Sequence, residues 1–145
     1  MSLHIRRYQA GDAEAVVALW RRCNLVVPHN DPGKDIARKL QADPAGFLVG
    51  EQDGAVIASC MVGYEGHRGW INYLAVDPSC QRQGFARQMM AAAEGRLRAL
   101  GCPKIQLLVR VSNASAAEFY RKIGFLADEV LSFGKRLESD LPVGE

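Results

Sequence analysis

The chain has 145 residues, of which 48% are hydrophobic, and its formal net charge is +2. This length predicts one compact domain over 1–145, with an ordered core over about 3–138 and a polar C-terminal tail. A charge so close to zero, with no basic run that contains interleaved aromatics, argues against nucleic acid as a partner.

The first residues lack the apolar segment of a signal peptide, and no run approaches the roughly 18 apolar residues of a membrane span. The sequence therefore predicts a soluble, cytoplasmic protein with no membrane partner. The 4 cysteines are scattered and form no Cys-x-x-Cys pair. This spacing predicts reduced thiols and no metal site.

The first half of the chain predicts a strand, two helices and a hairpin. A strand over 3–8 is followed by a helix that Asp12 is placed to cap, and Asp31-Pro32 predicts the start of a second helix that runs to residue 41. The apolar run 47–52, the turn Asp53-Gly54 and the run 55–64 predict two strands joined by a tight turn.

The second half predicts four strands and two helices. In chain order these are a strand over 70–76, a helix from Gly84 to a stop at Gly101, a buried strand over 104–109, a helix over 113–123, and two closing strands, Phe125 to Val130 and Leu131 to Leu137.

The resulting order, β-α-α-β-β-β-α-β-α-β-β, predicts an α/β fold. Its one strand-helix-strand crossover requires the strands that hold Val76 and Ile105 to be parallel neighbours.

The segment from Leu74 to Arg87 reads as a strand, a basic loop and a helix. Because Gly84 has no Cβ, a phosphate can approach the main chain there, and the start of the helix carries partial positive charge beside Arg82 and Arg87. The segment lacks the Gly-Lys-Ser/Thr of a P-loop and the three glycines of the dinucleotide fingerprint. It favours a pyrophosphate site, with an ordinary strand-to-helix turn bearing solvated arginines as the alternative.

Gln81, Gly84 and Ala86 stand at the three defining positions of Gln/Arg-x-x-Gly-x-Gly/Ala. The loop thereby resembles the signature of the GNAT superfamily of acyl-CoA-dependent N-acetyltransferases. Residues 113–125 resemble a second signature of that family, Asn-x-x-Ala-x-x-x-Tyr-x-x-x-Gly-Phe. The element order is also that of the GNAT fold, a mixed, mostly antiparallel sheet with a central splayed parallel strand pair. The segments 28–39, 63–69 and 101–105 resemble the small bacterial YpeA-type branch.

The resemblance implies acetyl-CoA as the cofactor, and transfer of the acetyl group to a primary amine of a small molecule or peptide by direct attack in a ternary complex. Tyr120 matches the family's catalytic general acid, and Asn113 matches a residue that binds the pantetheine arm. Without the resemblance, Asn113 is read as a helix cap and Tyr120 as a packing residue. The implied cofactor-binding residues are Leu74, Ala75, Val76, Gln81, Arg82, Gln83, Gly84, Phe85, Ala86, Arg87, Asn113 and Tyr120.

The general base is not marked in the sequence. Relatives place Glu or His at the positions of Trp70 or Asn72, or Glu at the position of Leu108, and this chain has none of these. The base therefore stays open between Glu65, His67 and a chain of water molecules. The candidate substrate-binding residues are Asn30, Asp31, Glu65, His67 and Asn72, although Asp31 is better explained as a helix cap.

A second function from another class remains open. Because no base is marked, the chain can also be read as a coenzyme A-binding sensor or partner-binding module that turns over weakly, although Tyr120 argues against this. The oligomeric state stays open between monomer and homodimer.

Overall fold

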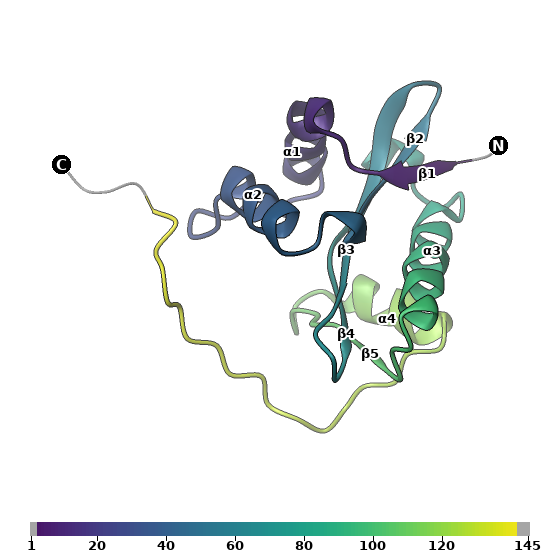
Figure 1. The fold of residues 1–145 in the computed structure, drawn as a ribbon. Coiled ribbons are helices and arrows are strands. Elements are labelled where there is room, and N and C mark those ends of the chain that lie inside the picture. Colours follow the sequence, from purple (N-terminus) through teal and green to yellow (C-terminus); the bar gives the residue numbers. More distant parts are fainter. Residues whose placement is uncertain (1–2, 142–145) are drawn as a thin grey trace. The chain divides into compact units, whose positions relative to one another are not determined.

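The computed structural model of the chain describes residues 3–141 (Figure 1). Its contacts divide these residues into two compact units, one formed by 3–106 with 140–141 and the other by 107–139, and each is described by itself. The prediction of a single domain therefore stays a prediction.

The described part of the first unit holds a five-stranded sheet with three α-helices. The elements in chain order are β1 (His4–Arg7), α1 (Ala13–Arg22), α2 (Pro32–Ala42), β2 (Phe47–Gln52), β3 (Ala55–Tyr64), β4 (Gly69–Val76), α3 (Phe85–Ala99) and β5 (Ile105–Gln106). The strands lie in the order β1-β2-β3-β4-β5, antiparallel except for the parallel pair β4 and β5. The predicted crossover through α3 is thus confirmed.

Local signals in the sequence account for the ends of several elements. Asp53 and Gly54, between β2 and β3, both have left-handed backbone with φ of 52° and 79°, as a two-residue hairpin turn requires. Pro32 begins α2, and Asp31 Oδ1 accepts a hydrogen bond from the Lys34 N–H at 3.1 Å. Both the turn and the Asp31 cap match the expectation from sequence.

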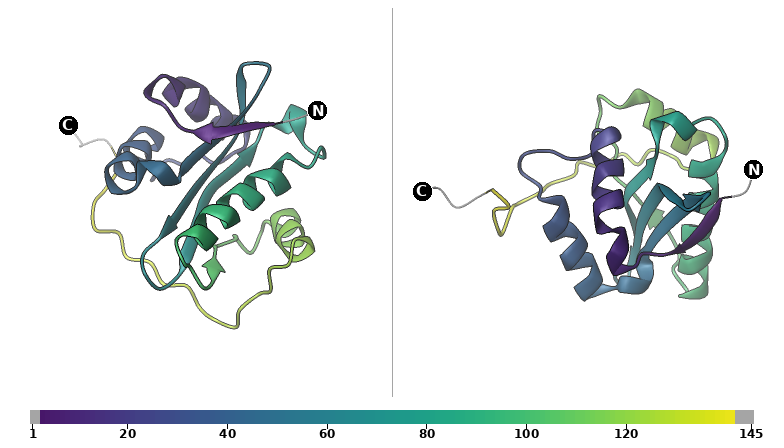
Figure 2. Two further views of the ribbon diagram at one scale, coloured as in Figure 1. Left: turned by 45° about the vertical axis from the view of Figure 1, so that its right-hand side comes forward. Right: turned by 90° about the horizontal axis from the view of Figure 1, so that it is seen from above.

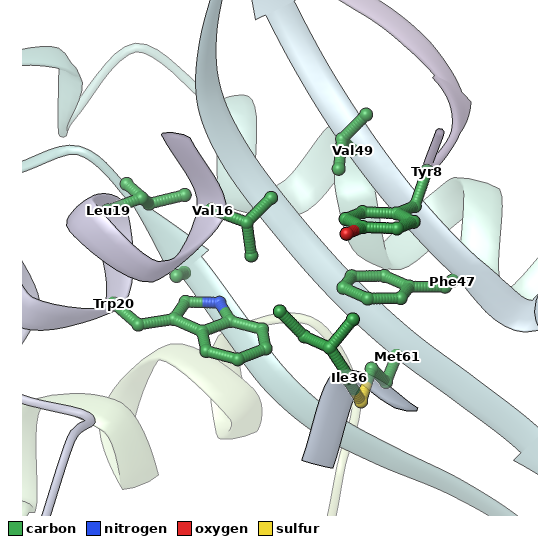
Figure 3. Close-up of a cluster of buried hydrophobic side chains, with 9 residues drawn as sticks. Tyr8, Val16, Leu19, Trp20, Ile36, Phe47, Val49 and Met61 are labelled. Carbon is green, nitrogen blue, oxygen red and sulfur yellow. The ribbon is translucent and has the colours of Figure 1, made fainter. Parts of the chain in front are cut away.

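Helices cover both faces of the sheet, with α1 and α2 on one face and α3 on the other (Figure 2). On the α1 and α2 face, the Tyr8 and Phe47 rings stack with centroids 4.4 Å apart, and the Trp20 ring lies 6.2 Å from Phe47 (Figure 3). Burial of such large aromatic side chains removes much apolar surface from water, so this cluster anchors α1 to the sheet.

The second unit contains α4 (Ala114–Lys122). Asn113 Oδ1 accepts a hydrogen bond from the Ala116 N–H at 3.1 Å, and the helix ends before Gly124, whose φ is 104°. The Tyr120 ring contacts Phe119 and Phe125 edge-on, with centroids 5.2 and 5.6 Å apart. Both the helix and its cap agree with the prediction.

Two sequence predictions are wrong in the C-terminal region. The segments Phe125 to Val130 and Leu131 to Leu137 are not strands, and β5 is shorter than the predicted strand over 104–109. The physical reason is that apolar composition forms a strand only beside another strand, and residues 125–137 form no strand of the described sheet. The parallel pair therefore lies at the edge of the described sheet, not at its centre.

The prediction that Asp12 caps the first helix is also wrong. Its carboxylate does not cap α1; it accepts from Arg6 Nη1 and Nη2 at 2.8 and 2.9 Å, and from the Gln9 N–H at 2.7 Å. Arg6 also contacts Glu51 at 3.2 Å. The hydrogen bonds from Arg6 hold the pKa of Asp12 below its ordinary value of 3.8, against the opposing effect of burial.

This network generates a pH-dependent prediction. Because the folded-state pKa of Asp12 is lowered, its stabilisation is present at neutral pH and is lost as the pH falls through that pKa. Asp12→Asn should lower the free energy of unfolding at neutral pH by about 1–3 kcal/mol, measured by urea denaturation. The difference between wild type and variant should shrink toward zero in acid, as the pH falls through the lowered pKa of Asp12; a difference that stays constant would contradict this role.

Candidate functional site

The connection from β4 to α3 leaves its main chain open. Gly84 precedes α3 with φ of 80° and ψ of 10°, and a Cβ built on it would meet no atom within 4 Å. Arg82 has left-handed backbone as well, with φ of 64°. Residues 81–84 are exposed, and the first N–H groups of a helix have no partner within the helix, a geometry suited to an anion.

A set of side-chain hydrogen bonds holds the start of this loop. Asp77 accepts from the Ser79 N–H at 3.0 Å and from its hydroxyl at 2.8 Å, and it pairs with Arg22 at 2.8 Å. The Ser79 hydrogen bonds, followed by Arg22, lower the pKa of Asp77, so it remains a carboxylate. Sequence reasoning gave no role to Asp77, although Asp-Pro-Ser is a typical turn signal.

The predicted loop residues divide into two groups. Arg82, Gln83 and Arg87 expose their side chains, whereas Phe85 is buried in the core and can offer a ligand only its main chain. The Gln81 side-chain amide donates to the Val76 carbonyl at 3.3 Å, which closes the loop onto the end of β4. The Gln81 side chain therefore helps to hold the shape of the loop.

The strand that leads into the loop has unpaired backbone. β4 pairs with β5 only at Gly69 with Ile105 and at Trp70 with Gln106, so its remaining six residues have no β5 partner in the described sheet. On its other side, the register with β3 is interrupted between Asn72 and Ala75. Leu74 lies in that interruption, and Ala75 and Val76 follow it, buried, at the end of the strand.

Tyr73 adopts left-handed backbone in this interruption, with φ of 52°. Such a conformation costs a residue other than glycine about 1–3 kcal/mol unless its surroundings hold it. The Tyr73 ring stacks on Trp20 with centroids 3.8 Å apart, and its hydroxyl donates to Asp35 Oδ2 at 2.6 Å. Desolvation by burial, followed by the hydrogen bond to Asp35, raises the pKa of Tyr73, so the phenol stays protonated.

The candidate substrate residues do not gather in one place. Asn30 and Asp31 line a cleft of about 470 Å³ beside α1 and the start of α2, together with Val17, Arg21, Val26, Val27, Pro28, Pro32, Gly33 and Asp140. Glu65 and His67 lie instead in the turn that precedes β4, and Asn72 is exposed within β4. The β3 to β4 turn is at the opposite end of β4 from the loop with Gly84.

Asp140 is a site residue that the sequence did not reveal. Its buried carboxylate accepts from Arg38 at 2.6 and 3.1 Å and from the Asp31 N–H at 2.9 Å. Arg38 and Asp140 are 102 residues apart in the sequence, so no local pattern could have paired them.

Glu65 also has an internal role. Its carboxylate accepts hydrogen bonds from the N–H groups of His67 and Arg68, with the first at 2.9 Å. The hydrogen bond from Arg68, followed by that from His67, lowers the pKa of Glu65. A carboxylate stabilised in this way is a weaker proton acceptor.

Asn113 and Tyr120 belong to α4 in the second unit. The side chain of Asn113 caps the helix, and that of Tyr120 is half-buried among aromatics. Their proposed roles toward a ligand stay predictions.

Two further observations concern metals and membranes. Within residues 3–141, no three side chains of His, Cys, Asp or Glu lie together so that they could hold a metal ion. In the same part of the chain, no helix combines the length and hydropathy needed to cross a membrane.

Comparison with known proteins identifies the family. Residues 13–125 match the Acetyltransferase (GNAT) family. The chain belongs to this family. The enzymatic class expected from the sequence, an acyltransferase, is therefore confirmed, and so is acetyl-CoA as the family's acetyl donor.

Two bacterial relatives cover nearly the whole chain. Acetyltransferase ECA0875 of Pectobacterium atrosepticum is 44% identical over 138 residues, covering 95% of this chain and 98% of its own length. Acetyltransferase SG1711 of Sodalis glossinidius is 45% identical over 139 residues, with the same coverage.

A solved structure shares the fold. The aminoglycoside N-acetyltransferase AAC(6')-Iy in complex with CoA superimposes with a TM-score of 0.75 at 22% identity, covering 94% of this chain and 95% of that one. The mixed sheet with its parallel β4 and β5 pair is thus the GNAT fold.

The exposed glycine at the loop generates a prediction about stability. Gly84→Ala should lower the free energy of unfolding by about 1 kcal/mol, because an L residue is strained at positive φ. Gly95→Ala is a matched control inside α3, where a Cβ also meets no atom within 4 Å. It should raise the free energy of unfolding by about 0.5–1 kcal/mol. If urea denaturation showed that both substitutions change the free energy of unfolding in the same direction, the left-handed conformation of Gly84 would be contradicted.

Proposed function

We propose that this protein is an acetyl-CoA-dependent N-acetyltransferase that acts on a primary amine of a small molecule or peptide. The observation that carries the proposal is the open, glycine-initiated start of α3 directly after a strand with unpaired backbone. Acetyl-CoA, when bound, supplies an activated acetyl group as a thioester. The chain's task is to hold that thioester and the amine in position for direct attack.

The loop fits a pyrophosphate. Backbone N–H groups at the start of α3 carry partial positive charge, and nothing fills the space beside Gly84. The exposed side chains of Arg82 and Arg87 add two full charges. We assign residues 81–87 to this role, with Gln81 acting by shaping the loop and Phe85 through its main chain.

The second half of β4 fits the pantetheine arm. Residues 74–76 have no β5 partner, so an extended amide-containing chain can bond to this side of β4 as an additional strand would, and a backbone N–H there can polarise the thioester carbonyl. In the reaction the C–N bond forms, the C–S bond breaks, the amine gives up a proton and the thiolate receives one.

We assign the proton donor for the thiolate to Tyr120, and contact with the pantetheine arm to Asn113. A phenol has an ordinary pKa of about 10, close enough to that of a thiol to protonate a nearby thiolate in a dry site. The family signature around α4 supports these roles.

We assign no side chain as the general base. The Glu65 carboxylate accepts hydrogen bonds within its own turn, and these lower its pKa. Both Glu65 and His67 lie at the end of β4 that is far from the loop with Gly84. The amine proton leaves through water to bulk solvent. Of the substrate candidates, Asn30 and Asp31 line the cleft beside α1 and α2, with Asp31 contributing chiefly as the cap of α2, and Asn72 is exposed on β4.

A catalytically weak coenzyme A sensor is the second candidate, because no base is marked. The experiment that separates the two is release of the coenzyme A thiol, followed with a thiol reagent, from acetyl-CoA with a panel of amines and peptides. We expect release that depends on at least one amine. Cofactor binding without amine-dependent release from any member of the panel would favour the sensor.

The loop assignment predicts the effect of Gly84→Glu. A bulky anion at the mouth of the loop should abolish binding of acetyl-CoA by steric clash and charge repulsion, measured by isothermal titration calorimetry. Gly66→Glu is the control, since Gly66 also has positive φ and open space but lies in the β3 to β4 turn. Normal affinity in Gly84→Glu, or equal loss in both variants, would refute the assignment.

The acid assignment predicts the effect of Tyr120→Phe. This variant should lower kcat by about 10- to 100-fold with little change in acetyl-CoA affinity, because it removes the proton donor and keeps the ring. Phe119 contacts the same ring, so Phe119→Leu is a control for packing. Turnover by Tyr120→Phe equal to wild type across pH would remove Tyr120 as the acid.

A further inference from the structure

A buried serine contacts the irregular part of β4. Ser59 lies on β3 and is fully buried, with 0% of its surface exposed. Its hydroxyl donates to the carbonyl of Tyr73 at 2.8 Å and accepts from Trp20 Nε1 at 2.8 Å. It therefore joins α1, β3 and the kinked residue of β4.

Both partners of Ser59 are polar groups that need a hydrogen bond. The Tyr73 carbonyl lies where the register between β3 and β4 is interrupted, and the indole N–H of Trp20 lies in a fully buried ring. A buried polar group without a hydrogen bond is strongly unfavourable. One hydroxyl, able to donate once and accept once, satisfies both groups, which an apolar residue of the same size could not do.

The orientation of the Tyr73 carbonyl determines that of the next N–H. The carbonyl of Tyr73 and the N–H of Leu74 belong to one planar peptide unit, and in a trans peptide they point in opposite directions. Since Ser59 draws the carbonyl toward β3, the N–H of Leu74 is directed away from β3. That is the side of β4 where pairing with β5 has already ended at Trp70.

The side chain of Tyr73 is held independently. Trp20 covers one face of its ring, and Asp35 of α2 accepts from its hydroxyl. Asp35 in turn pairs with Arg38 at 3.1 Å. With both its carbonyl and its ring fixed, Tyr73 can keep the left-handed conformation that turns the peptide unit.

We propose that Ser59, backed by Trp20, is a positioning residue for the thioester: it holds the Tyr73-Leu74 peptide so that the N–H of Leu74 is presented to the carbonyl oxygen of bound acetyl-CoA. The inference rests on the proposed function and adds the residues that orient its hydrogen-bond donor. Ser59 is too deeply buried to touch a ligand, so its effect passes entirely through the main chain of β4.

The test reads the polarisation of the thioester directly. Acetyl-CoA labelled with ¹³C at the acetyl carbonyl is bound to the full-length protein, and its carbonyl resonance is compared with that of free acetyl-CoA. In the wild type we expect a downfield shift on binding, as a hydrogen bond to the carbonyl oxygen produces. In Ser59→Ala the resonance should return toward the free value, while the affinity for coenzyme A stays within about twofold.

Turnover gives a second readout. With any acceptor found by the amine panel, Ser59→Ala should lower kcat by about 100-fold, the effect typical of a lost oxyanion donor, with little change in the KM for acetyl-CoA. Ser59→Thr keeps the hydroxyl and should restore both the shift and the rate. Ser59→Cys keeps the volume with a weaker donor and should give an intermediate shift, which preserves the test if Ser59→Ala does not fold.

Val62→Ala is the control for a loss of packing. Val62 is equally buried on β3 but belongs to the opposite face from Ser59, so its truncation should destabilise the fold and leave the carbonyl shift unchanged. A wild-type shift in folded Ser59→Ala or Ser59→Cys, or a lost shift in Val62→Ala, would overturn the inference. Failure of the wild type to bind acetyl-CoA would instead overturn the proposed function.

Discussion

The early end of the parallel pairing between β4 and β5 is the constraint on which the site depends. After Trp70 and Gln106, the outer backbone of β4 has no β5 residue to pair with in the described sheet. Backbone N–H and carbonyl groups require hydrogen-bond partners, so this edge suits an extended ligand. The same strand then delivers the chain to the open start of α3. One interrupted ladder thus places an edge suited to an extended ligand on the strand that leads to a loop suited to an anion.

Trp20 connects the hydrophobic core to this edge. Its ring packs with Phe47 inside the core and against Tyr73 on β4, and its N–H reaches Ser59. The stability of the fold and the geometry of β4 therefore depend on shared contacts. Such sharing explains how a left-handed Tyr73 is maintained, because a well-packed core resists the rearrangement that would relax it.

Carboxylates that look suited to an amine in the sequence already have partners in the fold. Asp31 caps α2, and Glu65 closes the β3 to β4 turn. A carboxylate that accepts several hydrogen bonds has less of its charge available to attract a cation. The charge of these carboxylates is therefore less available to an amine than the acidic composition suggests.

Short-range chemistry determined what the sequence by itself could establish: the Asp53-Gly54 turn, the Asp31 cap and the family motifs are each set by a few adjacent residues. Contacts between distant residues were beyond its reach, including Ser59 with Tyr73 and Arg38 with Asp140. The predicted strands over 125–137 failed for the same reason. Strand propensity is a local property, whereas a strand exists only where tertiary folding supplies a neighbour for its backbone.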